Sequence, residues 1–305
     1  MKKKLFLFSF VLDLLILIYF GVSYYFANQI VFFQSKTLEE EAKTYKIKSY
    51  ENVGLQSPEE IQIPIREITI KGWYFKGNHN CGIVFHHGYN STRLRVLKYY
   101  SLFNEYKCHL LFFDARHHGD STGTFTTYGY YEKTDLIDVI DVFEKKTGLI
   151  DNQIALVGES MGASIIIQFA GFSKRKFKMI LADSPFMDLK SIVKERAQVL
   201  YTNYSLIFLP GAFWIANFRT NADLEDVSPV KYARDVKTPI LILHSKSDDY
   251  TPYTHSEEVF KEIQIPEKEL ILTDWNSKHV ESIDDNFENY NQYLKNFIKK
   301  YDITF

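Results

Sequence analysis

Short apolar segments that recur along the chain constrain its fold more than any other feature of the sequence. Most contain four or five residues, and they are followed by a loop and a stretch with helical spacing. Strands buried on both faces of a parallel sheet need such continuous apolar runs, and strands that alternate with helices form a doubly wound α/β sheet. The expected strands are residues 82–85, 109–113, 154–157, 179–182, 240–243 and 269–272, and the expected helices are residues 92–103, 134–146, 161–172 and 254–263.

Two further segments complete this mostly parallel sheet. Residues 61–63 and 68–70 alternate between apolar and polar side chains, which is typical of half-buried strands, and residues 73–75 continue the second of them. Residues 186–236 separate two expected strands by about fifty positions, and a connection that long needs structure of its own. We predict that this segment is a helical cap over one end of the sheet.

The N-terminal part of the chain is apolar behind a basic start. Residues 1–4 include three lysines, and residues 5–26 are almost wholly apolar. As a helix, 22 residues reach about 33 Å, enough to cross the hydrocarbon core of a bilayer. Gly21 and Ser23 could form a signal-peptide cleavage site, but the apolar stretch of a signal peptide is usually shorter, which favours an uncleaved anchor. By the positive-inside rule, we expect a single-pass protein of the cell membrane with a cytoplasmic N-terminus and an extracytoplasmic domain.

Charge and cysteine content exclude some classes of protein. The 36 Lys and Arg residues against 38 Asp and Glu give a formal net charge of -2, which provides no basic field for nucleic acid. Two cysteines are too few for a disulfide scaffold or a structural zinc site. Cys81 and Cys108 begin neighbouring expected strands, where they could form a bridge outside the cytoplasm or remain buried free thiols. The sequence leaves the oligomeric state open.

The most informative motif is a G-x-S-x-G pentapeptide at residues 158–162, between an expected strand and an expected helix. In open α/β sheets, ligands bind beyond the carboxyl ends of the strands. A serine at a sharp strand-to-helix turn is crowded by its neighbours, and Gly158 and Gly162 relieve that crowding. The helix that follows directs its N-terminal amides at Ser160, where negative charge develops in acyl transfer. The motif therefore predicts a nucleophile at Ser160 in an elbow formed by Gly158 and Gly162.

A nucleophilic serine needs a base, and that base needs an acid to orient it. In this architecture the acid and then the histidine follow the serine along the chain. His279 lies in the loop after the last expected strand, whereas His255 begins an expected helix and His244 ends a strand before any suitable acid. We therefore prefer His279 as the base, with His255 as the alternative. Asp248 and Asp249 both lie in the loop after the penultimate strand, and on these grounds either could be the acid.

Two pairs of adjacent histidines, His86 with His87 and His117 with His118, raise the question of a metal site. Imidazole is the commonest metal ligand, but adjacent histidines lack the i, i+4 spacing of a helical zinc motif. We expect these side chains to form hydrogen bonds within loops, and we predict neither a metal nor a cofactor.

Taken together, the motifs resemble the α/β-hydrolase superfamily, and specifically its serine esterase, lipase and peptidase branch with N-terminal membrane anchors. The resemblance covers about residues 60–300. It rests on His86-His87-Gly88-Tyr89 as the oxyanion loop, residues 114–123 as the D-x-R-G-H-G-x-S-x-G stretch, residues 158–162 as the nucleophile elbow, and Asp248 and Pro252 four and eight residues after His244 in the acid loop. His117 and Ser245 stand where this family usually has glycine.

The resemblance implies a division of the chain and a choice of acid. The hydrolase domain would comprise residues 61–305, with the cap at about 186–236, and residues 27–60 would connect it to the anchor. The spacing in the acid loop selects Asp248 over Asp249.

The resemblance also implies a mechanism. His279 would take the proton of Ser160, Asp248 would fix the imidazole tautomer, and the backbone N–H groups of Tyr89 and Met161 would form the oxyanion hole. The implied enzyme is a serine hydrolase that cleaves carboxylic esters through an acyl-enzyme intermediate.

The cap bears on the substrate. Residues 201–218 are rich in aromatic and aliphatic side chains, which could pack as helices on the core. Alternatively they could form an acyl-chain pocket, or a surface that dips into the bilayer, and a lipid or acyl ester would then be the substrate. A serine peptidase of the aminopeptidase kind would instead need an acidic group in the cap, for which Glu225 and Asp226 are available. A catalytically inactive membrane-tethered binding module is a third alternative, against which the complete set of Ser, Asp and His argues.

Overall fold

The computed structural model describes residues 2–305; Met1, the first residue of the predicted basic start, lies outside the described residues. Within residues 2–305, eight strands form one sheet in the order β1-β2-β4-β3-β5-β6-β7-β8. β2 pairs antiparallel with β1 and β4, and the remaining pairs are parallel. The strands are β1 (Glu59–Ile65), β2 (Ile68–Phe75), β3 (Gly82–His86), β4 (His109–Phe113), β5 (Ile154–Glu159), β6 (Met179–Asp183), β7 (Ile240–Ser245) and β8 (Lys268–Thr273).

The burial of the strands explains why the apolar runs predicted them. Every residue of β3, β5, β6 and β7 is buried, as strands covered on both faces require. In β1, by contrast, Ile61, Ile63 and Ile65 are buried and alternate with exposed residues. The predicted mostly parallel sheet is therefore confirmed, and the structure adds that β1 and β2 form an antiparallel pair at one edge.

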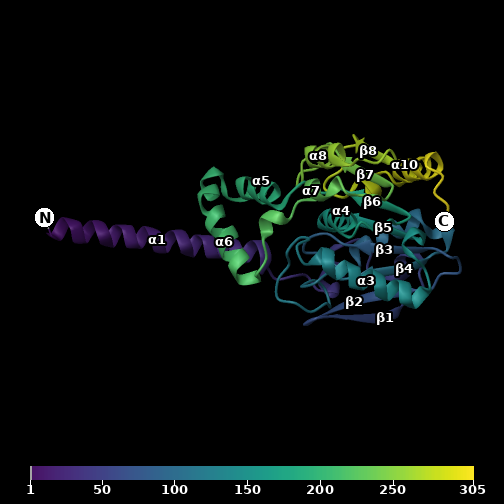
Figure 1. The fold of residues 1–305 in the computed structure, drawn as a ribbon, viewed down its shortest axis with the longest axis horizontal. Coiled ribbons are helices and arrows are strands. Elements are labelled where there is room, and N and C mark those ends of the chain that lie inside the picture. Colours follow the sequence, from purple (N-terminus) through teal and green to yellow (C-terminus); the bar gives the residue numbers. More distant parts are fainter. Residues whose placement is uncertain (1) are drawn as a thin grey trace.

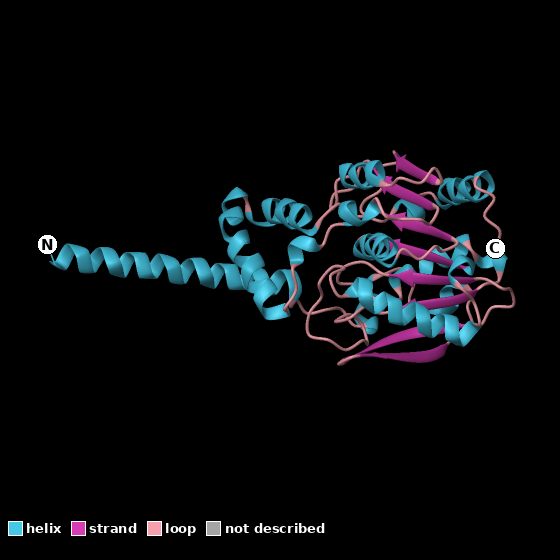
Figure 2. Cartoon of the chain, in the orientation of Figure 1, coloured by secondary structure: helices cyan, strands magenta, loops and turns pink. Residues whose placement is uncertain are grey.

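Helices cover both faces of the sheet (Figures 1 and 2). One layer contains α3 (Glu132–Thr147), α4 (Met161–Ser173), α7 (Pro229–Ala233) and α8 (Thr254–Glu262), and the other contains α9 (Ser282–Asp285) and α10 (Phe287–Lys300). The expected helix at residues 92–103 is a 3₁₀ helix, η2 (Arg95–Leu102), in the second layer. Four consecutive side chains of η2, from Val96 to Tyr99, are buried, so packing on several sides holds it rather than one amphipathic face.

A long helix, α1 (Lys2–Val31), projects from the body of the domain (Figure 1). In the described part of the chain it is the one helix long and apolar enough to cross a membrane. The chain then forms α2 (Leu38–Thr44) and a short 3₁₀ helix, η1 (Tyr50–Val53), before β1.

The cap consists mainly of α5 (Leu189–Tyr201), the 3₁₀ helix η5 (Asn203–Phe208) and α6 (Leu209–Thr220). It lies beyond the carboxyl ends of the parallel strands, and α6 packs lengthwise against α1 (Figure 2). Residues 201–218 pack on α1, and their buried side chains belong to the same hydrophobic core cluster as the C-terminal part of α1 and α4. These core residues are Ala212, Phe213, Ile215 and Ala216, so packing on the core describes part of this segment. Pro210 stands in the first turn of α6, where its missing N–H is tolerated.

A disulfide joins Cys81 and Cys108, so the two thiols are bridged rather than free. The bridge links the segments that lead into the parallel neighbours β3 and β4.

Candidate active site

Ser160 lies at the sharp turn between β5 and α4. Its φ of 51° and ψ of -118° lie in a region that residues with a side chain rarely adopt. A Cβ at Gly158 would lie 2.7 Å from the backbone nitrogen of Ala163, and one at Gly162 would lie 2.3 Å from the carbonyl oxygen of His86. Both glycines are therefore required by close backbone contacts, as the G-x-S-x-G pattern indicates.

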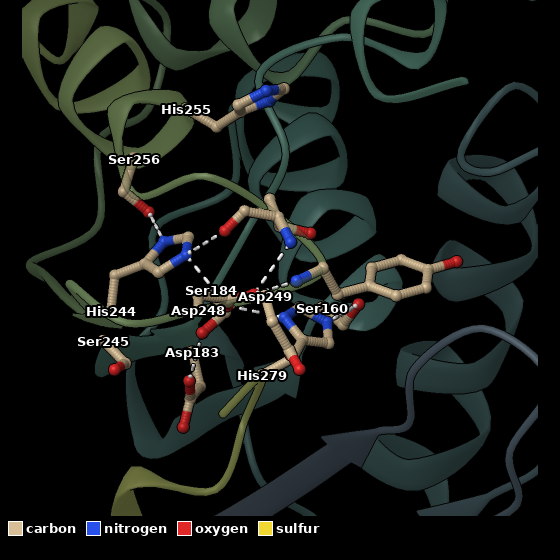
Figure 3. Close-up of polar contacts among 12 residues, drawn as sticks. Ser160, Asp183, Ser184, His244, Ser245, Asp248, Asp249, His255, Ser256 and His279 are labelled. Carbon is tan, nitrogen blue, oxygen red and sulfur yellow. Dashed lines mark hydrogen bonds and ion pairs between the residues drawn. The ribbon is translucent and has the colours of Figure 1, made fainter. Parts of the chain in front are cut away.

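The structure brings the side chains of Ser160, His279 and Asp248 into one hydrogen-bonded chain (Figure 3). The Ser160 Oγ lies 2.7 Å from Nε2 of His279, and Nδ1 of the same ring lies 2.6 Å from Oδ2 of Asp248. His279 comes from the loop after β8 and Asp248 from the loop after β7. The side chain of Asp249 is not part of this chain of contacts and is exposed.

Asp248 is held by four groups. Its Oδ1 accepts the backbone N–H groups of Tyr250 (2.9 Å) and Thr251 (2.8 Å), while Oδ2 faces His279 and, at 3.1 Å, Nε2 of His244. Burial tends to raise the pKa of Asp248, but the hydrogen bonds from His244 and His279 outweigh that effect and hold the pKa well below its usual range. The carboxylate is therefore ionised at neutral pH.

The other two downstream histidines have different surroundings. His244 contacts Asp248, and its Nδ1 lies 2.7 Å from the hydroxyl of Ser256, so it supports the carboxylate from the side opposite His279. Sequence reasoning rejected His244 as a base but gave it no other role; its position four residues before Asp248 was the available signal. His255 faces away from Ser160 (Figure 3), with its Nε2 2.9 Å from Glu195 on α5.

The two expected oxyanion donors lie beside Ser160. Met161 is the first residue of α4, so its N–H has no acceptor within the helix. Tyr89 follows Gly88, at which a Cβ would lie only 3.3 Å from the Cβ of Ser160. Tyr89, Ser160 and Met161 line the same cavity.

A buried ion pair beneath the turn was not predicted. Nζ of Lys98, in η2, lies 2.8 Å from Glu159, and both side chains are 2% exposed. The same ammonium group donates to the carbonyl oxygen of Val280 at 2.7 Å. Glu159 precedes Ser160 and Val280 follows His279, so one cation links the segments that carry the proposed nucleophile and base. The only sign of this ion pair in the sequence is that Lys98 stands alone among apolar and aromatic residues.

The two departures from the family's glycines are explained by contacts. Ser245 donates its hydroxyl to the carbonyl oxygen of Ser277 at 2.6 Å, which fastens the loop that carries His279. His117 adopts the left-handed conformation usual for glycine, with φ of 65°. Its Nε2 lies 2.7 Å from the carbonyl oxygen of Phe33, just beyond α1.

The paired histidines contact loop backbone. Nε2 of His87 accepts the N–H of Ala115 at 2.9 Å, and Nδ1 of His118 lies 2.8 Å from the carbonyl oxygen of Arg116. Burial lowers the pKa of His86 and of His118 to about 4, so both rings are neutral at pH 7. Residues 2–305 contain no group of three or more His, Cys, Asp or Glu side chains arranged to hold a metal ion.

A cavity of about 190 Å³ opens above Ser160. Its walls are mainly apolar and come from the cap, from the loops around Ser160 and from α1, which contributes Phe26 and Ile30. The C-terminal turn of α1 is tied to the domain there, since the hydroxyl of Tyr128 donates to the carbonyl oxygen of Ile30 at 2.7 Å. Among the described residues that line the cavity, Arg196 is the one with a charged side chain.

Comparisons with known proteins identify the family to which the chain belongs. Residues 124–302 match the model of the prolyl oligopeptidase family. The chain is 30% identical to the uncharacterized protein YqkD of Bacillus subtilis over 284 residues, which is 90% of each chain. It is also 26% identical over 195 residues to the lysophosphatidylserine lipase ABHD12 of Rattus norvegicus, which covers 59% of this chain and 45% of that protein.

Solved structures show the same fold. The esterase Pf2001 of Pyrococcus furiosus superposes with a TM-score of 0.66 at 22% identity, covering 83% of this chain and 95% of that one. The family model matches more than half of the chain, and the chain shares the fold of this esterase. The chain is therefore an α/β-hydrolase that belongs to the prolyl oligopeptidase family.

Proposed function

We propose that this hydrolase is a serine esterase that cleaves carboxylic acyl esters through an acyl-enzyme intermediate. The observation that carries the proposal is the unbroken hydrogen-bonded chain from Ser160 through His279 to the buried, ionised Asp248. That arrangement allows a serine hydroxyl to lose its proton as it attacks a carbonyl carbon.

The first proton transfer uses side chains that are already in contact. His279 takes the proton of Ser160 as the Oγ bonds to the carbonyl carbon, and Asp248 stabilises the resulting imidazolium. The backbone N–H groups of Met161 and Tyr89 hold the oxyanion, an interaction whose loss costs about 2.7–4 kcal/mol per donor in other hydrolases. His279 then returns the proton to the departing alkoxide, and a water molecule activated by the same ring releases the acid.

The cavity favours esters over substrates with a free amine. A peptidase that binds an N-terminal amine needs a carboxylate near the serine, and the described side chains that line the cavity include none. Glu225 is instead 3.2 Å from Lys190, and Asp226 accepts a hydrogen bond from the hydroxyl of Tyr232 at 2.8 Å. The similar proteins include a lipase and an esterase as well as peptidases, so the choice of an ester rests on the cavity.

We also propose that α1 anchors the protein in the cell membrane with the hydrolase domain outside the cytoplasm. The length and composition of α1 support the anchor. The disulfide between Cys81 and Cys108 supports the orientation, because such bonds persist in oxidising compartments and are rare in the cytoplasm.

The test uses the full chain and adjacent residues as matched variants. Ser160→Ala should abolish hydrolysis of p-nitrophenyl acetate and labelling by a fluorophosphonate. Asp248→Asn should lower kcat by about four orders of magnitude, since the imidazole then loses its orienting carboxylate, whereas Asp249→Asn should leave it near that of the wild type. Retained hydrolysis in purified Ser160→Ala, or a larger loss in Asp249→Asn than in Asp248→Asn, would contradict the proposal. An alanine p-nitroanilide, with its free amine, should be turned over far more slowly than the ester.

A further inference from the structure

The exposed part of α1 that projects from the domain is shorter than the hydrocarbon core of a bilayer is thick. Residues 5–18 are exposed and apolar apart from Ser9 and Asp13. As a helix, these 14 residues span about 21 Å, whereas the hydrocarbon core of a bilayer is about 30 Å thick. The missing 9 Å or so correspond to about six more residues, which brings the edge of the hydrocarbon to the level of Tyr24.

The cap lies beside these additional residues. The hydroxyl of Tyr19 accepts the N–H of Gly211 at 3.1 Å, and Ser23 donates to the carbonyl oxygen of Phe208 at 3.1 Å. A bilayer that covers α1 as far as Tyr24 therefore also surrounds the end of η5 and the start of α6.

The outer surface of the cap suits such an environment. Large apolar or aromatic side chains there are strongly exposed: Tyr204 (88%), Ile207 (66%), Trp214 (62%) and Phe218 (79%). Residues 203–218 contain no Asp, Glu, Lys or Arg. This surface is continuous with the exposed face of α1, as the ring contact between Phe20 and Trp214 shows, with centroids 6.2 Å apart.

A charged side chain, that of Arg219, lies at the level of α1 where the hydrocarbon core should end. Arg219, the first charged residue after this stretch, donates to Asn28 at 2.6 Å and lies over the ring of Tyr24, 4.8 Å from its centroid. Arginine and tyrosine together at one level are typical of the border between lipid and water.

The cavity lies directly behind this surface. Phe26 and Ile30 of α1 and Tyr201 and Leu209 of the cap line it together with Ser160. We propose that η5 and the outer face of α6 lie within the lipid bilayer, and that the cavity receives a membrane-resident acyl ester directly from the lipid between α1 and the cap. The identity of the ester as substrate rests on the proposed function, whereas the depth of the cap does not.

The depth of the cap can be measured without any catalytic readout. The chain has three tryptophans, so Trp73→Phe with Trp275→Phe leaves Trp214 as the sole tryptophan, which is excited selectively over the tyrosines. The matched control keeps only Trp73, which is 6% exposed within the domain. In phosphatidylcholine vesicles with brominated acyl chains, the fluorescence of Trp214 should be strongly quenched and that of Trp73 should not. Equal quenching of the two would place the cap outside the lipid, against another copy or another protein, and would overturn the proposal.

Delivery from the lipid is tested with two esters. Trp214→Gln with Phe218→Gln should lower hydrolysis of a long-chain acyl ester held in phosphatidylcholine vesicles about tenfold or more, since two aromatic side chains that the proposal places in the lipid are lost. It should leave hydrolysis of soluble p-nitrophenyl acetate unchanged, because neither residue lines the cavity above Ser160. The control variant, Val142→Gln with Ile150→Gln, changes exposed residues of the domain body and should retain both activities.

An equal loss on both esters in the Trp214 and Phe218 variant, or no loss on either, would overturn delivery from the lipid. A wild-type protein that hydrolyses neither ester would overturn the proposed function, and the quenching experiment would still decide where the cap lies.

Discussion

Ser160 has a backbone conformation that its own side chain opposes. Its φ and ψ, 51° and -118°, mirror ordinary extended backbone, which glycine adopts freely and other residues adopt at a cost of about 1–3 kcal/mol. The surrounding contacts maintain this conformation, since Gly158 and Gly162 are pressed against neighbouring backbone. The turn is thus held in place by packing, and its strain aims the hydroxyl at His279.

Removing the Cβ of residue 160 should therefore stabilise the fold. We expect Ser160→Gly to have a free energy of unfolding about 1 kcal/mol higher than that of Ser160→Ala, because only the alanine retains the Cβ that disfavours a positive φ. Both variants lack the hydroxyl, so urea unfolding of the pair isolates the backbone effect. An alanine variant as stable as the glycine variant would show that this turn stores no strain.

Arg196 is expected to bias the cavity toward anionic esters. Its guanidinium lies 4.0 Å from the ring centroid of Tyr250, which stacks on His279, and its Nε has no hydrogen-bond partner within the described residues. Arg196→Gln should lower kcat/KM about tenfold for an ester that carries a carboxylate or phosphate, and much less for a neutral ester of equal chain length. Lys194→Gln, a loss of charge on the same helix outside this cavity, is the control. A loss that is the same for both esters would rule out anion recognition by Arg196.

At the scale of elements, a buried ion pair links the turn that carries Ser160 to the loop that carries His279. Lys98 of η2 reaches both Glu159, at the end of β5, and Val280, in the loop after β8. A buried charge deprived of its partner is strongly destabilising. The ion pair therefore couples the position of the turn to that of the loop carrying His279.

Lys98→Met should accordingly lower the free energy of unfolding by about 3–5 kcal/mol, because Glu159 is left buried and unpaired. Adding Glu159→Gln should recover part of that loss, since the unpaired charge is removed. In the exposed pair of Lys295 and Glu105, whose side chains are 45% and 53% exposed, Lys295→Met should change stability by less than about 1 kcal/mol. Thermal and urea unfolding of the three variants provide the measurement, and a loss for Lys98→Met no larger than that for Lys295→Met would contradict the coupling.

The sequence predicts an element well when only one local structure fits its residue pattern. Continuous apolar runs such as residues 154–157 fit a strand covered on both faces, and the G-x-S-x-G pattern fits a turn with backbone on either side. Residues 201–218 were ambiguous because an apolar surface is equally suited to protein, to lipid or to a ligand. Their packing on α1 depends on partners almost two hundred positions away, as the bond from Gly211 to Tyr19 illustrates. Lys98 was missed for the same reason, since a local pattern does not show that folding brings Glu159 to it.

For the whole molecule, the disulfide joins segments of the domain that are distant in sequence. Cys81 and Cys108 are separated by 27 positions, and closing a loop of that length stabilises a fold by about 3–4 kcal/mol in the chain-entropy model. The double variant Cys81→Ser with Cys108→Ser should lower the free energy of unfolding by an amount of this order.

The same bond reports on orientation. Both cysteines are buried in the folded domain, so the thiols are probed after cells are quenched with acid and the protein is denatured. Neither cysteine should then react with a maleimide until a reductant is added. Labelling without reductant would place the domain in a reducing compartment and contradict the proposed topology.

The contribution of Phe26 and Ile30 to the cavity changes how an anchor-free fragment should be regarded. Hydrophobic N-terminal segments are often removed to obtain a soluble protein. Here the deletion would remove the wall of the cavity that Phe26 and Ile30 form, and the hydroxyl of Tyr128 would lose its acceptor, the carbonyl oxygen of Ile30. Kinetic constants or inhibitor rankings obtained on such a fragment would describe an enzyme with a wider and wetter entrance. Under the proposed function, the preference for acyl-chain length should therefore be measured on the intact polypeptide, because the helix proposed as the anchor also lines the cavity.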